Sequence, residues 1–244
     1  FNYLSKMCLL RMRQAAFSMV EMARERGCTV IVAGSDATVH ADQYLARGAD
    51  FVLIGEGEHT LVELLDRATG RDDRPYRSIP GLAFRESETI GSPSGLASDV
   101  CRTPRRPDIE DLDALPFPAW DLIDVERYRE IWYRRHGYYS MNMVTTRGCP
   151  FHCNWCAKPI WGQHYSIRSP ENVVAELRWL KETHQPDHVW FVDDIMGLDS
   201  GWMARFADLV EAENARVPFK CLNRPDLLLR HGEIEALKRA GCQI

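Results

Sequence analysis

The sequence predicts an α/β protein in which a partial doubly wound layer is followed by the first part of a parallel β/α barrel. Short apolar runs at residues 29–34 and 51–55 alternate with helical patterns, as in a parallel sheet that is buried on both faces. Three further strand and helix patterns follow from residue 139 onward. Repeated alternation of this kind is typical of doubly wound sheets and barrels.

The first layer opens with a helix. Apolar residues within 8–26 recur at the spacing of one helical face, and Gly27 follows where a helix would stop. The pattern then predicts a strand, a helix, a strand and a helix at residues 29–34, 40–47, 51–55 and 59–68. We therefore expect the first domain to cover residues 1–70.

A connector is expected over residues 71–138, where seven of the 13 prolines of the chain fall. Residues 79–89 are expected to form a small hairpin within it. The barrel part is expected over residues 139–244, because the alternation resumes there with a strand that leads into a cysteine-rich loop.

The helix after this loop has a clear start. Ser169 precedes Pro170, which is the arrangement of a cap residue before a proline at the first helical position. The remaining strands are predicted at 188–193 and 217–223, and the remaining helices at 201–213 and 231–240. An active site in such a barrel lies at the carboxyl ends of the strands.

The composition of the chain indicates which class of ligand the protein binds and in which cellular compartment it is found. The 244 residues have a formal net charge of −5 and no dense basic run, so a small-molecule substrate is expected rather than nucleic acid. No apolar stretch of about 18 residues and no signal peptide is evident, which predicts a cytoplasmic protein without a membrane span. Because the chain begins at Phe1 and ends just after a strand-like Gly241-Cys242 pair, we expect an internal fragment.

Three of the eight cysteines lie within eight residues, in the CxxxCxxC spacing of Cys149, Cys153 and Cys156. A four-iron cluster held by three thiolates keeps one iron open for another ligand. The alternative is a structural zinc site, with His152 or His164 as the fourth ligand. Zinc knuckles prefer two pairs of ligands, so the spacing favours the iron–sulfur cluster.

With Trp155 immediately before the third cysteine, this loop resembles the cluster loop of the radical S-adenosylmethionine (SAM) superfamily. The resemblance implies that the three cysteines bind a 4Fe-4S cluster and that SAM occupies the open iron. An electron from the cluster then cleaves SAM to methionine and a 5′-deoxyadenosyl radical. The resemblance also implies that the backbone of Trp155 contacts adenine and that a low-potential donor such as flavodoxin or ferredoxin supplies the electron.

Polar residues follow the next two predicted strands. Asp193 and Asp194 match a Phe-x-Asp-Asp pattern of one branch of the superfamily, which implies contact with the methionine amino group of SAM. A helix cap or turn is the alternative role for this pair. Asn223 and Arg224 are expected to contact the ribose or carboxylate of SAM, although a surface ion pair is an equal alternative for Arg224.

The first domain resembles the cobalamin-binding domain that precedes the barrel in one radical SAM subgroup. Glycine-containing turns at two strand ends carry this resemblance, since small residues permit close approach of a ligand there. The residues expected to bind cobalamin are Gly34, Ser35, Gly55, Glu56 and Gly57.

The first of these turns departs from the subgroup. Residues 33–36 read Ala-Gly-Ser-Asp where many members have Gly-Gly-Pro-His. His40 and His59 are not expected to be cobalt ligands, although imidazole is able to serve as one.

The resemblance as a whole implies a cobalamin-dependent radical SAM enzyme, with methyl transfer to an unactivated carbon or phosphorus centre as the leading expectation. The cofactors supply the reactive groups, and no side chain is assigned a catalytic role. Ring formation or oxidation, as in the anaerobic porphyrin-ester cyclases, is the alternative within this class. A noncatalytic module with structural zinc beside a nucleotide-binding or protein-binding domain is the alternative of another class.

Overall fold

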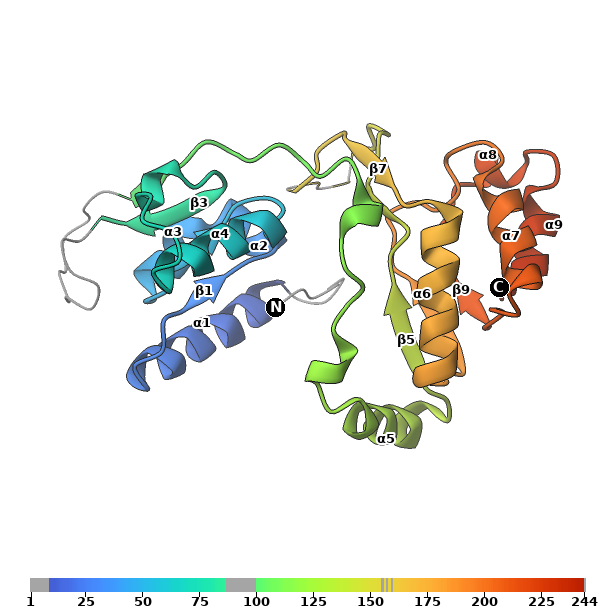
Figure 1. Cartoon of the computed structure of the whole chain (residues 1–244), viewed down its shortest axis with the longest axis horizontal. Helices are drawn as coiled ribbons and strands as arrows, with labels where there is room; N and C mark the ends of the chain where they lie inside the picture. The colour runs from blue at the N-terminus through green and yellow to red at the C-terminus, as the bar shows by residue number, and fades with distance from the viewer. Residues whose placement is uncertain (1–8, 87–99, 155, 157, 159, 244) are drawn as a thin grey trace. The chain divides into compact units, whose positions relative to one another are not determined.

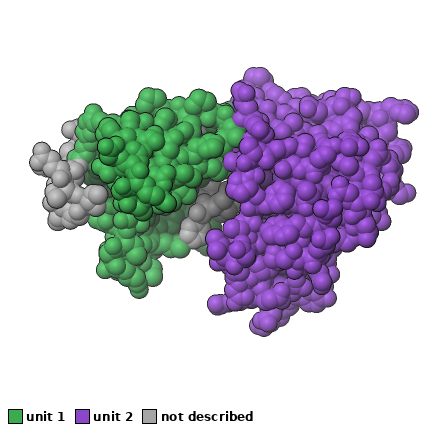
Figure 2. All heavy atoms as spheres, in the orientation of Figure 1, with its two compact units in different colours: residues 1–109, 154–162 green, residues 110–153, 163–244 purple. Residues whose placement is uncertain are grey.

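The computed structural model describes residues 9–86, 100–154, 156, 158 and 160–243, which form two compact units (Figure 1, Figure 2). Unit 1 comprises Phe1–Ile109 and Asn154–Gly162, and unit 2 comprises Glu110–Cys153 and Gln163–Ile244. The segment after Cys153 therefore belongs to unit 1, although the sequence on either side of it belongs to unit 2. Within the described residues, every helix is too short or too polar to cross a membrane.

Unit 1 contains the predicted series of helices and strands. Its strands β1 and β2 pair in parallel, with Ile31 opposite Phe51. The helix predicted at 40–47 is present as α3, and a short helix that was not predicted, α2, precedes it. His40, with φ −117° and ψ 33°, separates the two helices. The elements are α1 (Leu9–Glu25), β1 (Ile31–Val32), α2 (Ser35–Val39), α3 (Ala41–Ala46), β2 (Phe51–Leu53), α4 (Glu58–Ala68) and the short 3-10 helix η1 (Tyr76–Ser78).

Strand β2 is buried on both faces, as its apolar sequence predicts. Successive side chains of a strand point to opposite faces. Val52 packs in a cluster with residues of α1, α2 and α3, among them Val20, Ala37 and Tyr44. Phe51 and Leu53 pack on the other side with Leu64 of α4. Helices therefore cover both faces of the sheet, which is the doubly wound arrangement.

Two strands from the proline-rich stretch extend this sheet. β3 (Leu82–Arg85) pairs antiparallel with β2, and β4 (Val100–Arg102) pairs antiparallel with β3. A hairpin thus begins where the sequence predicts, but its second strand is β4 and residues 87–99 lie outside the described part of the chain. Leu82 is fully buried, so this stretch contributes to the core of unit 1. The predicted domain boundaries at residues 70 and 138 stay predictions.

A parallel sheet with the order β5-β8-β9 forms the centre of unit 2. Ser140 lies opposite His188, and Val189 lies opposite Phe219. A parallel bridge joins Phe219 to Cys242, where the sequence predicts a further strand. The elements are η2 (Leu112–Ala114), η3 (Trp120–Leu122), α5 (Val125–His136), β5 (Ser140–Met143), β6 (Thr146–Gly148), β7 (Tyr165–Ile167), α6 (Pro170–Thr183), β8 (His188–Phe191), α7 (Trp202–Ala212), β9 (Phe219–Lys220), α8 (Pro225–Leu228) and α9 (Glu233–Ala240).

Two features of unit 2 differ from the sequence expectation. The strand predicted from residue 139 into the cysteine loop is two strands, because the chain turns after β5 and β6 pairs antiparallel with β7. Helix α5 was not predicted, because residues 71–138 are expected to be a proline-rich connector, although Tyr128, Ile131 and Trp132 recur at the spacing of one helical face.

Replacing Ser169 with alanine is expected to lower the free energy of unfolding by about 1 kcal/mol. The Ser169 hydroxyl accepts a hydrogen bond of 3.0 Å from the backbone N–H of Asn172 and so caps α6, as predicted. Urea unfolding of the alanine and threonine variants checks this, because threonine keeps the accepting oxygen. An alanine variant as stable as the natural protein would show that the cap contributes nothing.

Candidate functional site

The unit 2 residues of the site predicted from the sequence lie at one edge of the parallel sheet of that unit. Because β5, β8 and β9 run in the same direction, their carboxyl ends meet at that edge. The chain reaches Cys149 there through β6, and it leaves β8 through Asp193 and β9 through Asn223. Figure 1 shows β5 pointing toward the end of unit 2 at which β7, the partner of β6, lies.

The cysteine loop is open to solvent. Cys149 is partly exposed, and Cys153 and Cys156 are exposed. Within the described residues, no three Cys, His, Asp or Glu side chains lie close enough together to hold a metal ion. The assignment of the three cysteines as cluster ligands stays a prediction. Trp155, predicted to contact adenine, lies outside the described residues.

Asp193 is 2% exposed and its carboxylate is held by the turn between β5 and β6. It accepts hydrogen bonds of 2.7 Å and 2.9 Å from the backbone N–H groups of Thr145 and Thr146, and one of 2.7 Å from the Thr145 hydroxyl. Burial raises the pKa of Asp193 to about 6, although these donors oppose the shift. These contacts stabilise the turn between β5 and β6, and a turn role is the alternative that the sequence leaves open for Asp193. Asp194, by contrast, is exposed.

Arg224 connects the end of β9 with the cysteine loop. Its guanidinium lies 3.6 Å from the ring centroid of Phe151, which stands between Cys149 and Cys153 in the sequence. It also pairs with Asp226 at 2.9 Å, and this hydrogen bond is the main reason that the pKa of Arg224 is raised. The surface ion pair weighed for Arg224 is therefore present, and the same side chain lies against the predicted cluster loop.

Asn223 directs its two amide atoms differently. Its Oδ1 accepts a hydrogen bond of 2.7 Å from the backbone N–H of Arg224. Its Nδ2 is buried and has no hydrogen-bond partner among the described residues. A buried donor of this kind is a natural partner for a ligand oxygen or a water molecule.

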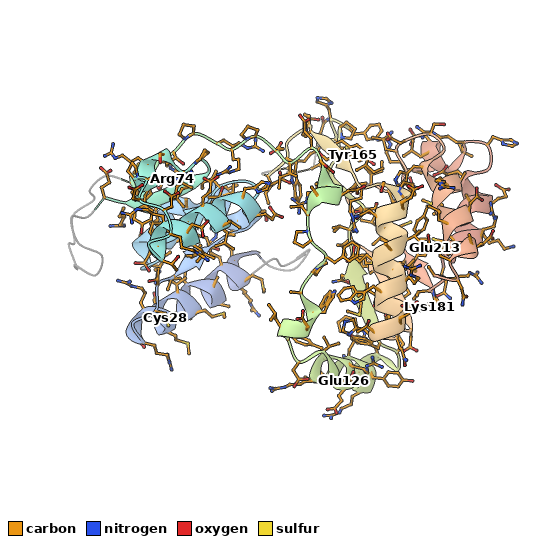
Figure 3. All side chains as sticks on the ribbon, viewed as in Figure 1. Cys28, Arg74, Glu126, Tyr165, Lys181 and Glu213 are labelled. Atoms are coloured by element: carbon orange, nitrogen blue, oxygen red, sulfur yellow. The ribbon has the colours of Figure 1, made fainter. Side chains whose placement is uncertain are left out.

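Tyr165 on β7, labelled in Figure 3, lies opposite Gly148 in the β6 and β7 hairpin. Burial raises its pKa, and the carboxylates of Asp199 and Asp193 add to the shift. The phenol therefore stays protonated beside the start of the cysteine loop. Sequence reasoning missed Tyr165, Phe151 and the Thr145 contact, since each depends on pairing between separate segments.

Unit 1 contains a cavity of about 160 Å³ at the end of β1. Gly34 and Ser35 line it, whereas the described lining does not include Gly55, Glu56 or Gly57. The loops after β1 and β2 nevertheless touch, because the Gly55 backbone N–H donates to the Thr38 hydroxyl at 3.1 Å. The lining residues are Ala16, Met19, Val20, Val30, Ile31, Val32, Ala33, Gly34, Ser35, Asp36, Ala37 and Tyr44.

The charged group of this cavity is already paired. Asp36, which stands where many members of the resembled subgroup have histidine, binds both Nε and Nη2 of Arg13 at 2.8 Å and 2.6 Å. The Tyr44 hydroxyl donates a further hydrogen bond of 2.7 Å. The bond to Arg13 is the main cause that lowers the pKa of Asp36. Asp36 thus ties α2 to α1 and α3.

Glu56, predicted to bind cobalamin, is 7% exposed and contacts protein donors. It accepts a hydrogen bond of 2.9 Å from the Trp161 indole N–H and another from the backbone N–H of Ile109. The predicted cofactor roles of Gly34, Ser35, Gly55, Glu56 and Gly57 stay predictions.

Residues 143–244 match the family described as the Radical SAM superfamily. Over 88% of its length, the chain is 27% identical to the anaerobic magnesium-protoporphyrin IX monomethyl ester cyclase of Synechocystis sp., of which it covers 40%. Over 59% of its length, it is 30% identical to the cytidylyl-2-hydroxyethylphosphonate methyltransferase of Streptomyces wedmorensis, of which it covers 30%. The chain therefore spans less than half the length of these relatives.

A solved structure extends the comparison to the fold. The cobalamin-dependent SAM radical enzyme OxsB, with aqua-cobalamin bound, matches with a TM-score of 0.70 and 16% sequence identity. The match covers 96% of this chain and 33% of OxsB, and it confirms the predicted α/β fold class. The resemblance stated for the cysteine loop is also confirmed: residues 143–244, which include Cys149, Cys153 and Cys156, form a domain of the radical SAM superfamily.

Proposed function

We propose that this chain is part of a cobalamin-dependent radical SAM enzyme that methylates an unactivated carbon or phosphorus centre of a small organic molecule. The observation that carries the proposal is the CxxxCxxC loop, which begins at the carboxyl edge of a parallel sheet and lies inside the region that matches the radical SAM superfamily. Similarity to a phosphonate methyltransferase supports methyl transfer. The fold shared with cobalamin-dependent OxsB supports the second cofactor.

Cys149, Cys153 and Cys156 would hold a 4Fe-4S cluster. Their chemistry fits this group, because three thiolates leave one iron open to SAM. The described residues between Cys149 and Tyr165 contain no helix or strand, so little regular structure has to change when the thiolates converge. When bound, the cluster and SAM supply radical chemistry, and cobalamin supplies a transferable methyl group.

Residues at the strand ends would orient SAM. Because the Asp193 carboxylate is held by Thr145 and Thr146, we assign the methionine amino group chiefly to the exposed Asp194. Arg224, with its guanidinium against the cysteine loop, would bind the SAM carboxylate. Asn223 would donate its buried amide N–H to the ribose. The backbone of Trp155 would contact adenine.

Cobalamin would bind to unit 1 at the ends of β1 and β2. The cavity lined by Gly34 and Ser35 supports this position, and so do the adjoining turns that carry Gly55 and Gly57. The ends of neighbouring strands are the usual ligand sites of doubly wound sheets. The charged side chain of the cavity, Asp36, is paired with Arg13 and would not compete for the cofactor.

A low-potential flavodoxin or ferredoxin would supply the electron, and the reaction would take place in the cytoplasm. Reduction of a thiolate-bound cluster requires a reducing compartment, which supports both assignments.

Ring formation is the second candidate function, and similarity to the cyclase of Synechocystis sp. favours it. The two functions differ in their use of SAM. A methyltransferase consumes SAM both as a radical source and as a methyl donor, whereas a cyclase needs only the radical source.

Turnover with methyl-labelled SAM distinguishes these functions. The protein carrying this chain, at its natural length, is incubated anaerobically with reductant, cobalamin and the small-molecule fraction of its source cells. We expect 5′-deoxyadenosine, S-adenosylhomocysteine and a labelled small molecule in similar amounts. 5′-Deoxyadenosine without S-adenosylhomocysteine would favour the cyclase, and failure to retain added cobalamin would remove the cobalamin half of the proposal.

A further inference from the structure

The buried carboxylate of Glu56 holds two distant segments of unit 1. Glu56 lies in the turn that follows β2, between Gly55 and Gly57, yet it is only 7% exposed. Burying a carboxylate is unfavourable unless hydrogen-bond donors replace its water. Two donors from other parts of the chain do so: the Trp161 indole N–H at 2.9 Å on Oε1, and the backbone N–H of Ile109 on Oε2.

Each of these donors lies near the end of one of the two segments that make up unit 1. Ile109 is the last residue of the first segment of unit 1, after which the chain passes into unit 2. Trp161 lies near the end of the second segment, Asn154–Gly162, which carries Cys156. One carboxylate therefore holds both segments through which the chain leaves or re-enters unit 1.

A second contact strengthens the same attachment. Arg105 donates to the backbone carbonyl of Ile160, next to Trp161, and pairs with Asp108 at 2.6 Å. The Arg105 guanidinium also lies close to Gly55, so that a Cβ at this glycine would be 3.5 Å from Nε. The turn after β2 thus lies against Arg105, four residues before Ile109, and Arg105 in turn contacts the end of the Cys156 segment.

We propose that Glu56 is a positioning residue that anchors the segment carrying Cys156 to the end of β2 and thereby places the third thiolate. The inference rests on the proposed function in one respect, the assignment of Cys156 as a cluster ligand. It replaces direct cobalamin binding as the role of the Glu56 side chain. The two donors bind different oxygens of the carboxylate, so each donor has its own acceptor.

Two substitutions remove the anchor in different ways. Glu56→Gln replaces one of the two accepting oxygens with an amide N–H₂ group. One hydrogen bond is lost, and the N–H₂ group then faces another N–H donor. Trp161→Phe removes the indole N–H and leaves the bond to Ile109. Glu58→Gln is the matched control, because Glu58 is a glutamate two residues away that is exposed.

Hydrogen–deuterium exchange on the protein at its natural length measures the anchor without any cofactor. We expect amides of residues 154–162 to exchange at least tenfold faster in the Glu56→Gln and Trp161→Phe variants than in the natural protein. The double variant should add less than twofold, because both changes break the same contact. Exchange in α6 and in the Glu58→Gln control should stay unchanged.

The reconstituted enzyme gives a second measurement, the KM for SAM, which a purely structural role of Glu56 would leave unchanged. After reconstitution, the Glu56→Gln variant should need a severalfold higher SAM concentration for half-maximal 5′-deoxyadenosine formation, with kcat changed less than twofold. Unchanged exchange in residues 154–162, an equal effect of Glu58→Gln, or an unchanged KM would overturn the inference. Absence of a cluster from the natural protein would refute the proposed function and the placement of a third thiolate, whereas unchanged exchange with normal SAM cleavage would refute the anchor alone.

Discussion

Replacing Arg168 with leucine will lower the free energy of unfolding by about 3–5 kcal/mol, because it leaves a buried carboxylate without its cation. Arg168 and Glu176 are 7% and 2% exposed, and their Nη1 and Oε2 atoms are 2.5 Å apart. Arg168 also donates hydrogen bonds of 2.7 Å to the Asn172 side chain and to the Val144 carbonyl. Urea unfolding followed by circular dichroism measures the loss.

The double variant Arg168→Leu with Glu176→Leu is the control for this result. Replacing both members of a buried ion pair with apolar residues is often neutral, so the double variant should recover more than half of the lost stability. Burial already raises the pKa of Glu176, and removing Arg168 will raise it further. The single variant should therefore lose less stability at pH 5 than at pH 8. A double variant no more stable than the single one would contradict the ion-pair explanation.

Replacing Asp193 with asparagine will remove a pH dependence of stability between about pH 4 and 7. The pKa of Asp193 is raised by burial from 3.8 to about 6, so the fold favours the protonated carboxyl. Its contribution to stability is complete below the ordinary pKa and is lost as the pH rises through 6. The asparagine variant does not titrate at this position. Relative to it, the natural protein should lose about 3 kcal/mol across this range, at about 1.4 kcal/mol for each pKa unit.

Urea unfolding of both proteins at several pH values between 4 and 7 measures this difference. Asparagine keeps an oxygen that accepts from the backbone N–H groups of Thr145 and Thr146, which preserves much of the turn. The Asp194→Asn variant serves as the control, since it makes the same change at the neighbouring residue, which is exposed. A difference in stability between the natural protein and the Asp193 variant that does not vary with pH would contradict the raised pKa.

Together, Asp193 and Arg168 fix the turn that leads into the cysteine loop. The Asp193 carboxylate accepts hydrogen bonds from the backbone N–H groups of Thr145 and Thr146. The Arg168 side chain donates to the carbonyl of Val144, and the Arg168 backbone N–H donates to the carbonyl of Thr145. The position of β6, which precedes Cys149, therefore depends on two buried charged groups. This is the physical link between stability of the fold and the candidate site.

Features that repeat locally in the sequence could be predicted. The alternation of apolar runs with helical patterns located β1, β2, β8 and most helices, and Ser169 with Pro170 located the start of α6. The start of the cysteine loop could be placed at the carboxyl end of a strand, because the cysteine spacing and the preceding strand are both evident within one short stretch of sequence. These signals depend on backbone preferences and on burial of whole faces.

The partners of the polar side chains could not be predicted in the same way. An acidic residue at a strand end has the same sequence signal whether it faces a ligand or a neighbouring turn. Asp193 reaches Thr145 and Glu56 reaches Trp161 only after the intervening chain has folded. Helix α5 escaped prediction for another reason, because it follows a proline-rich stretch that is typical of a connector, although Val125, Tyr128 and Trp132 recur at helical spacing.

Electron paramagnetic resonance of the anaerobically reconstituted and reduced protein, at its natural length and with and without SAM, tests most directly whether Cys149, Cys153 and Cys156 hold a cluster with one open iron. We predict brown iron–sulfur absorption, a reduced-cluster signal that changes when SAM binds, and formation of 5′-deoxyadenosine. Single alanine variants of these cysteines should lose all three properties, whereas alanine at the exposed Cys28 (Figure 3) should retain them. Stoichiometric zinc, with no iron–sulfur absorption and no cleavage of SAM, would contradict the cluster assignment.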